Sequence, residues 1–392
     1  MAAPKLNAAE KAKILGKVTA DINKKAGRTV IGTLQDPDIA EQAKIVFLKT
    51  PSSELNVALG GGFPLGKIVE LMGENSSGKT SLAIETMAKD MAEDPDSIWG
   101  WYESEGSFDM EYAKQFPGFD ESRLYIWYME DEGAEKGLDF LEAMLRTGQF
   151  RGIVVNSVAG LTPSREMESE MGKQDIALQA RMMSKLMRKI TAVANRYKTL
   201  CLFINQFRTN VGQMFGDPTT TTGGKALAFY STQRIAMRKV KLENGDGITD
   251  EEGLKISCRI GKNRVAKGNP YKAAKFTAIY GMGIDQVRGV ALMAVENNLV
   301  EKSGAWIYFP SKANTIVMPN GVEAKFASMA KFIDAMRDET NSLFETLRDL
   351  VEAKASQGHI ATELLDEDDI KAITKFEKHL EDEMKVDEED EG

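Results

Sequence analysis

One eight-residue stretch constrains the fold of this chain more than any other feature. It reads Gly73-Glu74-Asn75-Ser76-Ser77-Gly78-Lys79-Thr80, and it separates an apolar run from a helical pattern. A glycine-rich turn between a strand and a helix lets backbone N–H groups converge on phosphate oxygens at the helix N-terminus. A lysine there neutralises the β- and γ-phosphates, and the hydroxyl that follows it holds Mg²⁺. The stretch, with the adjacent Ser81, therefore predicts a site for ATP and Mg²⁺.

Apolar runs and helical patterns alternate along the chain around this stretch. Strands are expected at Ile68–Met72, Ser97–Tyr102, Leu124–Tyr128, Gly152–Val155 and Thr199–Ile204, with helices at Ser81–Met91, Ala134–Arg146 and Leu178–Asn195. Such alternation is typical of an α/β fold with a mostly parallel central sheet. Three later runs predict antiparallel additions to that sheet, namely Ala226–Val240, Leu254–Ile260 and Lys275–Tyr280.

The composition excludes several classes of protein. Of the 392 residues 42% are apolar, which is ample for a core and excludes a chain without stable structure. No apolar run reaches the roughly 18 residues that span a membrane, and the N-terminus has no apolar signal core. Cys201 and Cys258 lie in strand-like runs and cannot build a disulfide framework or a metal cluster. We therefore expect a cytoplasmic protein that does not enter a membrane.

Pattern and charge divide the chain into an arm (1–45), a core (46–285), a small α/β domain (286–356) and a tail (357–392). In the arm, Asn7 and Glu10 are spaced like a helix-capping pair. A narrow apolar stripe follows at helical spacing and must dock on its own domain or on a neighbouring subunit. The stripe consists of Ile14, Leu15, Val18 and Ile22. The small domain is expected to hold a helix at Val287–Asn297, a strand at Ala305–Phe309, and helices at Ala324–Met336 and Ser342–Ala355.

The charge of the chain is unevenly distributed. Residues 381–392 contain eight acids and one lysine, and so account for −7 of the net charge of −9. The first 28 residues hold seven lysines and arginines against two acids. The negative net charge therefore does not argue against nucleic acid as a partner, because most of the excess acid lies in the tail.

Polar side chains at the ends of two expected strands are candidates for chemistry. Glu103 and Glu105 follow the strand at Ser97–Tyr102, and they point the same way if that strand continues through them. Hydrolysis of ATP needs a base for the attacking water, although a solvated strand end explains the same pattern. Another strand ends in Asn156, where nucleotide hydrolases of this architecture normally have an aspartate near the metal. An asparagine brings no charge to Mg²⁺.

A long polar stretch follows Asn205-Gln206 at the end of the last parallel strand. It runs for roughly 18 residues without a repeated apolar face, and long loops in compact domains are usually functional. Arg208 and Asn210 suit phosphodiester oxygens, and Met214 and Phe215 suit contacts with bases.

A second irregular stretch, Glu168–Ile176, precedes a helix with one basic face formed by Arg181, Lys185 and Arg188. On its own, such a face is a solvated surface. Two glycine-bearing loops beside it favour a polyanion as the partner.

Several long motifs in the same order show that this chain resembles the bacterial RecA recombinase family, including its phage-encoded relatives. The similarity is dense from about Leu55 to Tyr280 and looser to Trp306. The motifs besides the phosphate loop are Gly60–Glu70, Ser157–Pro163, Ala180–Ser184 with Met187-Arg188-Lys189, Phe203–Gln206, Met214–Gly216 and Thr220–Gly224.

The resemblance implies roles for residues at the nucleotide. Glu105 occupies the position of the catalytic glutamate, and Asp109 and Tyr112 match residues that contact adenine. Gln206 matches the glutamine that senses the γ-phosphate and couples it to the DNA loops. Lys262 and Arg264 match a lysine pair that reaches the ATP of the neighbouring subunit, and Phe229 falls at a subunit interface.

The resemblance also implies two DNA loops, Glu168–Ala177 and Phe207–Thr221. Ile176 and Val211 lie where apolar side chains insert between base triplets. Contacts to the backbone of single-stranded DNA are implied for Arg181, Ser184, Arg188, Gly223 and Gly224.

Taken together, the motifs imply a RecA-like phosphate-loop ATPase core with an N-terminal oligomerisation helix. The expected function is that of a DNA-dependent ATPase that forms helical filaments on single-stranded DNA and exchanges strands with double-stranded DNA. Its expected location is the cytoplasm, which is the host cytoplasm for a phage protein. Two alternatives stay open, namely an ATP-binding filament or mediator protein with weak hydrolysis, which Asn156 motivates, and a hexameric helicase with the same core.

Overall fold

The fold is given by a computed structural model that describes residues 6–131, 133–168, 176–209, 219–242, 248–266, 272–309, 325–338 and 340–356. Residues 1–46 and 47–392 form two units, and each is described by itself. Within the described ranges, no helix combines the length and the apolar character needed to cross a membrane.

The N-terminal unit contains two helices, α1 (Ala8–Ala26) and α2 (Pro37–Ala43). The predicted capping pair is confirmed, because Glu10 N donates to Asn7 Oδ1 and Asn7 N donates to Glu10 Oε2, both over 2.9 Å. The apolar stripe of α1 is 40–61% exposed within this unit. A row of exposed apolar side chains of this kind requires a partner surface.

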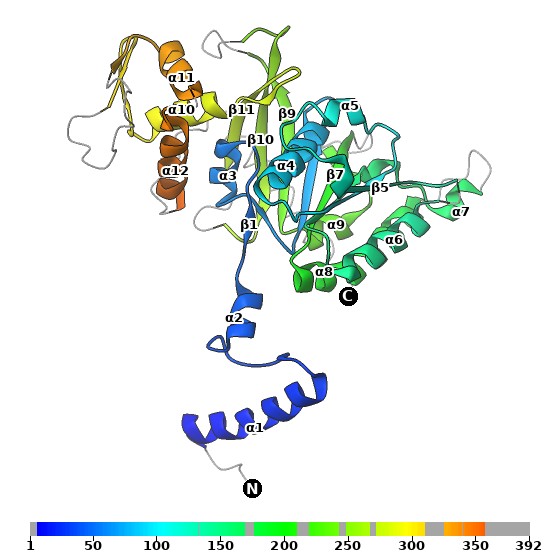
Figure 1. Cartoon of the computed structure of the whole chain (residues 1–392). Helices are drawn as coiled ribbons and strands as arrows, with labels where there is room; N and C mark the ends of the chain where they lie inside the picture. Colours follow the sequence, from blue (N-terminus) through cyan, green and yellow to red (C-terminus); the bar gives the residue numbers. More distant parts are fainter. Residues whose placement is uncertain are drawn as a thin grey trace. The chain divides into compact units, whose positions relative to one another are not determined.

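A ten-stranded sheet forms the core of the second unit (Figure 1). The strands from β9 to β5 are parallel, and those from β9 to β12 are antiparallel. The predicted α/β fold with a mostly parallel sheet is therefore confirmed. The spatial order is β12 (Gly283–Ile284), β11 (Ala273–Ile279), β10 (Gly253–Asn263), β9 (Gln233–Val240), β3 (Ile68–Gly73), β7 (Leu200–Thr209), β6 (Gly152–Asn156), β4 (Trp99–Glu103) and β5 (Leu124–Tyr128), with β8 (Thr219–Thr221) paired to β7.

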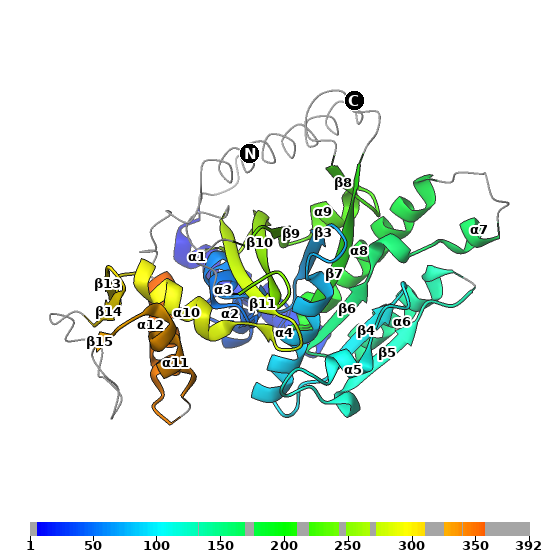
Figure 2. The same cartoon turned by 90° about the horizontal axis from the view of Figure 1, so that it is seen from above.

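Helices cover both faces of the sheet because its crossovers run in both directions. The chain moves from β3 towards β5 through α4 (Lys79–Glu93) and α5 (Met110–Ala113). It returns through α6 (Ala134–Thr147), α8 (Ile176–Tyr197) and α9 (Lys225–Tyr230). Right-handed crossovers in opposite directions place their helices on opposite faces, as Figure 2 shows for α4 and α8.

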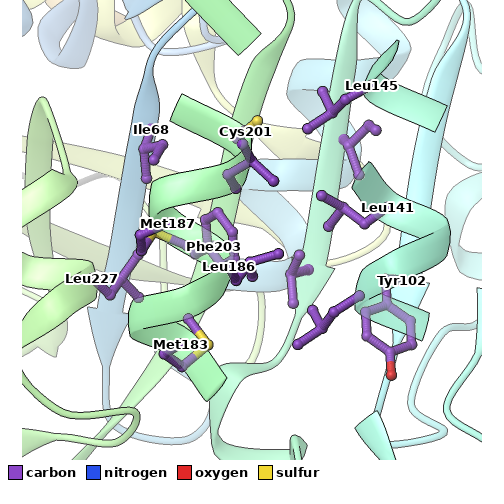
Figure 3. Close-up of a cluster of buried hydrophobic side chains, with 14 of the residues drawn as sticks. Ile68, Tyr102, Leu141, Leu145, Met183, Leu186, Met187, Cys201, Phe203 and Leu227 are labelled. Carbon is purple, nitrogen blue, oxygen red and sulfur yellow. The ribbon is translucent and has the colours of Figure 1, made fainter. Parts of the chain in front are cut away.

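The face under α6 and α8 holds a large apolar cluster (Figure 3). Met183 and Leu186 of α8 belong to this cluster together with Cys201 and Phe203 of β7, and Leu141 comes from α6. Both cysteines are buried and free. This packing fixes the sheet whose carboxyl ends carry the polar residues.

The predicted small domain, made of helices and short strands, follows β12 within the second unit. Its core is an apolar cluster around Phe332 that also includes Val57 of α3 (Ser53–Leu59). The elements are α10 (Gln286–Glu296), β13 (Glu301–Ser303), β14 (Trp306–Tyr308), β15 (Lys325–Phe326), α11 (Met329–Arg337) and α12 (Leu343–Ser356). The remaining short elements of the chain are β1 (Phe47–Leu48), β2 (Phe63–Pro64), η1 (Glu121–Arg123), η2 (Val158–Gly160) and α7 (Ser164–Met167).

Three element predictions are wrong. The expected strand at Ala226–Val240 begins as helix α9, whose crossover makes β9 parallel to β3 rather than antiparallel to the sheet. The expected helix at Ala324–Met336 starts only at Met329, because Lys325–Phe326 pairs as β15 and Ser328 caps the helix. Strand β7 continues beyond Gln206 to Thr209, because β8 pairs with it as an antiparallel hairpin.

Candidate nucleotide-binding and catalytic site

The phosphate loop joins β3 to α4 with the predicted geometry. Gly78 caps α4 with φ +84°, and a Cβ there would lie 2.6 Å from Ile256 Cδ1. A Cβ on Gly73 would lie 2.3 Å from the carbonyl oxygen of Met237, so neither position accepts a larger residue. The first N–H groups of α4, which include those of Thr80 and Ser81, have no acceptor within the helix and suit phosphate oxygens.

Lys79 is held across this loop. Its ammonium donates to the carbonyls of Gly73 (3.2 Å) and Glu74 (2.6 Å) and to Ser77 Oγ (3.2 Å). The side chain is buried, and burial lowers its pKa. A buried cation bonded to neutral oxygens gains more from an anionic phosphate than from its present partners.

A cavity of about 310 Å³ lies beside the loop, between α4, the start of β10 and the end of β11. Tyr112 and Tyr280 line it, and Tyr112 Oη donates to Ser81 Oγ over 2.7 Å. Asp109 caps α5 by accepting from the N–H groups of Glu111 (2.9 Å) and Tyr112 (3.1 Å), so it fixes Tyr112. Two aromatic rings beside a phosphate loop suit a purine base.

Several lining residues of this cavity were absent from the predicted site, and Tyr280 and Glu85 are those whose chemistry matters most. Tyr280 follows β11, about 200 positions from the loop, and no local pattern brings it there. Glu85 of α4 is buried, and both of its oxygens accept from Ile284 N over 3.1 Å. Burial raises the pKa of Glu85 to about 7. Glu85 lies six positions after Lys79 in the helix, and this spacing gave no reason to predict that it belongs to the site.

The structure separates the two candidate carboxylates. Glu103 ends β4 and is 1% exposed, and its oxygens accept from Trp101 Nε1 (3.0 Å), Asn156 Nδ2 (2.9 Å) and Glu105 N (2.8 Å). It therefore anchors the turn that carries Glu105 instead of facing solvent. The strand stops at Glu103, so the condition for a shared orientation of the two carboxylates is not met. A solvated strand end is wrong for Glu103, which is buried, although Glu105 is exposed.

Glu105 is exposed and lies between β4 and β7. Its Oε1 accepts from Gln206 Nε2 over 2.7 Å and also from Ser157 Oγ. Gly73 at the end of β3 pairs with Gln206 of β7, so this contact lies beside the phosphate loop. Of the two carboxylates, Glu105 is thus the remaining candidate for the base, and Gln206 donates to it directly.

Asn156 lies next to Glu103 in the sheet and is buried. Its amide nitrogen donates to Glu103 Oε2 (2.9 Å) and to Ser107 Oγ (3.1 Å). An aspartate here would lose both bonds and place a second carboxylate against Glu103. The neutral side chain is therefore explained by its neighbour. The side-chain oxygen of Asn156 is a suitable ligand for Mg²⁺ together with the Thr80 hydroxyl and phosphate oxygens. Mg²⁺ usually retains several bound waters and therefore needs few ligands from the protein.

The Asn156→Asp variant is expected to be less stable than the wild type by about 3 kcal/mol without Mg²⁺, because two buried carboxylates then repel. Repulsion raises the folded-state pKa of the pair, so the penalty grows as the pH rises from 5 to 8. Urea unfolding in a chelator measures both effects, and the exposed Asn298→Asp is the control. A variant as stable as the wild type at pH 8 would contradict this explanation.

Two cations lie at the end of β10 beside an exposed aromatic ring. Lys262 Nζ and the Arg264 guanidinium lie 6.0 Å and 5.8 Å from the ring centroid of Phe229, which is 65% exposed. Lys262 donates to the carbonyls of Ala228 (2.7 Å) and Phe229 (2.8 Å) at the end of α9. Burial, Arg264 and Arg234 lower the pKa of Lys262 to about 8. The cluster is a positive surface ready for an anion.

Part of the expected DNA surface lies within the described residues. Arg181 and Arg188 are exposed on α8, and Arg188 Nη1 donates to Ser184 Oγ over 2.9 Å. Gly223 N donates to Gln179 Oε1 (3.2 Å), a contact between α8 and the start of α9 that no sequence signal indicated. Gly224 caps α9 and Arg208 is exposed on β7. Asn210, Val211, Met214, Phe215 and the side chain of Ile176 lie outside the described residues.

The sheet, its crossovers and the loop between β3 and α4 define an α/β protein of the phosphate-loop class. The family model of the RecA N-terminal domain matches residues 13–285. This chain belongs to the RecA family.

Curated relatives cover most of the chain. Protein RecA of Saccharopolyspora erythraea is 40% identical over 299 residues, which is 76% of this chain and 83% of that protein. Protein RecA of Cutibacterium acnes is 39% identical over 303 residues, or 77% and 83% of the two chains. Protein RecA of Streptomyces rimosus is 38% identical over 299 residues, which is 76% of each.

Proposed function

We propose that this protein is an ATP-dependent DNA recombinase. It assembles into helical filaments on single-stranded DNA, hydrolyses ATP when DNA is bound, and pairs and exchanges strands in recombination and repair. Membership of the RecA family supports the class of function. The observation that carries the proposal is the 2.7 Å bond from Gln206 to Glu105, because it joins the candidate base to the strand that continues into the β7–β8 hairpin.

The ATP site uses residues of one subunit for binding and for proton transfer. Lys79 and the first N–H groups of α4 hold the phosphates, and Thr80 and Asn156 lie where Mg²⁺ would bind. The bound ion supplies charge neutralisation at the phosphates. Glu105 accepts a proton from the attacking water, and Gln206 releases Glu105 when it turns towards the γ-phosphate. Tyr112 and Tyr280 hold the base, with Asp109 fixing Tyr112.

A neighbouring subunit completes the site. Glu105 follows β4, whereas Lys262 and Arg264 lie at the end of β10, and the strands β9, β3, β7 and β6 lie between β10 and β4 in the sheet. Lys262 and Arg264 are on the exposed cluster with Phe229, so they serve the ATP of the next subunit. A contact between two different surfaces does not close on itself and generates a helical filament. The apolar stripe of α1 suits the same head-to-tail assembly.

In this proposal the protein binds DNA without distinguishing one base sequence from another. Arg181, Ser184, Arg188 and Arg208 contact phosphates, and the N-terminus of α9 after Gly223 and Gly224 adds backbone N–H groups. Ile176, Val211, Met214 and Phe215 contact bases, with Asn210 on the phosphates. Base pairing between the strands then supplies the specificity. The proposed location is the cytoplasm, or the host cytoplasm for a phage protein.

ATP hydrolysis with and without single-stranded DNA tests the proposal. We expect turnover that rises at least about tenfold with DNA, in line with ordinary allosteric coupling. Electron microscopy with DNA and a non-hydrolysable ATP analogue should show helical filaments. Weak turnover that DNA does not change would instead favour an ATP-binding mediator, and closed rings with unwinding activity would favour a helicase.

Removal of residues 381–392 is expected to strengthen binding to double-stranded DNA, by a few-fold or more at low salt, because a charge of −7 no longer competes with phosphates. The gain should vanish at high salt. Fluorescence anisotropy measures it, and a tail of equal length with glutamine and asparagine in place of the acids should behave like the truncation. An unchanged affinity would mean that the tail does not compete.

A further inference from the structure

An ion pair is buried in the middle of the sheet, below the phosphate loop. Arg234 Nε of β9 donates to Glu70 Oε2 of β3 over 2.6 Å, and the side chains are 6% and 0% exposed. The other carboxylate oxygen of Glu70 accepts from Asn205 Nδ2 of β7 over 2.9 Å. Buried ion pairs are weak stabilisers, so their presence calls for another reason.

The side-chain amide of Asn205 makes all four of its possible hydrogen bonds in this network. Its nitrogen also donates to the carbonyl of Thr222 (3.0 Å), and its oxygen accepts from Thr222 Oγ1 (2.7 Å) and from Gln206 N (2.9 Å). Thr222 directly follows β8 and precedes Gly223. Asn205 therefore fastens the returning arm of the β7–β8 hairpin to the strand that leads into the phosphate loop.

The network reaches both halves of the ATP site. Asn205 and Gln206 are consecutive on β7, so their side chains point to opposite faces, and Gln206 holds Glu105. On the other side, Arg234 pairs with Lys262 in the sheet, and Arg234 lowers the pKa of Lys262 while Glu70 raises it. A movement of Thr222 can thus pass through Asn205 and Gln206 to Glu105, and through Asn205 and Glu70 to Arg234, which neighbours Lys262 in the sheet.

We propose that Asn205 is a positioning residue that transmits the binding of single-stranded DNA at the hairpin to the ATP site, through Thr222 on one side and the Glu70–Arg234 pair on the other. The inference rests on the proposed function, which supplies the DNA-dependent hydrolysis to be transmitted. Because the hydrogen bonds are fully satisfied, the network has a defined resting arrangement, and loss of one bond unfastens the hairpin without removing a charge.

Thr222→Val tests this inference with the smallest change. It keeps the shape of the side chain and deletes only the hydroxyl that donates to Asn205. We expect the stimulation of ATP hydrolysis by single-stranded DNA to fall about tenfold, within the usual range of coupling between sites. The DNA-independent rate and the affinity for a fluorescent ATP analogue should stay within about twofold. Thr222→Ser keeps the hydroxyl and should restore stimulation.

Thr199→Val is the matched control. Thr199 is fully buried directly before β7, and its hydroxyl donates to the carbonyl of Phe150 over 2.8 Å, at the end of β7 opposite to Thr222. The Thr199→Val variant therefore also loses one hydrogen bond from a threonine hydroxyl. It should leave the stimulation of ATP hydrolysis by single-stranded DNA unchanged.

The outcomes distinguish this inference from the proposed function. Loss of stimulation in Thr222→Val but not in Thr199→Val supports it, and urea unfolding verifies that both variants are folded. Equal stimulation in the two variants overturns the inference alone. A wild type that DNA does not stimulate would overturn the proposed function, and with it the inference.

Discussion

The Glu105→Gln variant is expected to bind ATP and single-stranded DNA as the wild type does, and to hydrolyse ATP at least about 10²-fold more slowly. Glutamine has the same shape, and its carbonyl oxygen can still accept the bonds from Gln206 and Ser157 that hold the side chain. It cannot accept a proton from water at neutral pH. Binding is measured with a fluorescent ATP analogue and labelled DNA, and turnover by phosphate release.

Glu111→Gln is the control for Glu105→Gln. Glu111 is an exposed carboxylate on α5, a few residues further along the chain, and its neighbour Lys114 lies 3.7 Å away at the surface. Its replacement should leave hydrolysis unchanged. Normal hydrolysis by Glu105→Gln would remove Glu105 as the base. Glu103 would not simply replace it, because that carboxylate is buried and its oxygens are occupied by N–H donors.

The double variant Lys262→Ala/Arg264→Ala is expected to hydrolyse ATP about 10³-fold more slowly than the wild type in the presence of DNA. A cation that contacts the transition state of phosphoryl transfer raises the rate by at least that factor. Each subunit should still bind ATP, since its own phosphate loop is intact. Lys239→Ala, which removes an exposed cation from β9, should have little effect. Hydrolysis by the double variant at the wild-type rate would show that the pair does not act on ATP.

Mixing the two inactive variants tests whether the site is shared. In a random filament, some interfaces join an intact Glu105 on one subunit to intact Lys262 and Arg264 on the next. Equal amounts should recover about a quarter of the wild-type rate, since neighbours combine independently in a head-to-tail assembly. Mixing should recover nothing if Glu105 and the two cations act within one subunit.

The phosphate loop could be predicted from the sequence because its glycines, lysine and hydroxyl are local and its flanking strand and helix are short-range patterns. The parallel strands next to it were predictable for the same reason. The apolar start of α9 runs into β9 without a break in composition, so the sequence could not show where helix ends and strand begins. That boundary decides whether β9 is parallel to β3.

The remainder of the candidate site depends on contacts between distant segments. Alternation along a strand could not choose between Glu103 and Glu105, because the choice depends on where β4 stops and on Asn156 in the next strand. Tyr280 enters the cavity from β11, and Glu70 meets Arg234 across 164 positions. Asn156 departed from the expected pattern, and only its neighbour Glu103 explains that departure in physical terms.

A strand-exchange assay tests the central claim most directly. Circular single-stranded DNA is incubated with a homologous linear duplex, the protein and ATP, and joint molecules are separated on a gel. We predict joint molecules with ATP but not with ADP, and only between homologous DNAs, because base pairing supplies the specificity. DNA-stimulated ATP hydrolysis and filaments without any joint molecules would contradict the assignment of this protein as a recombinase.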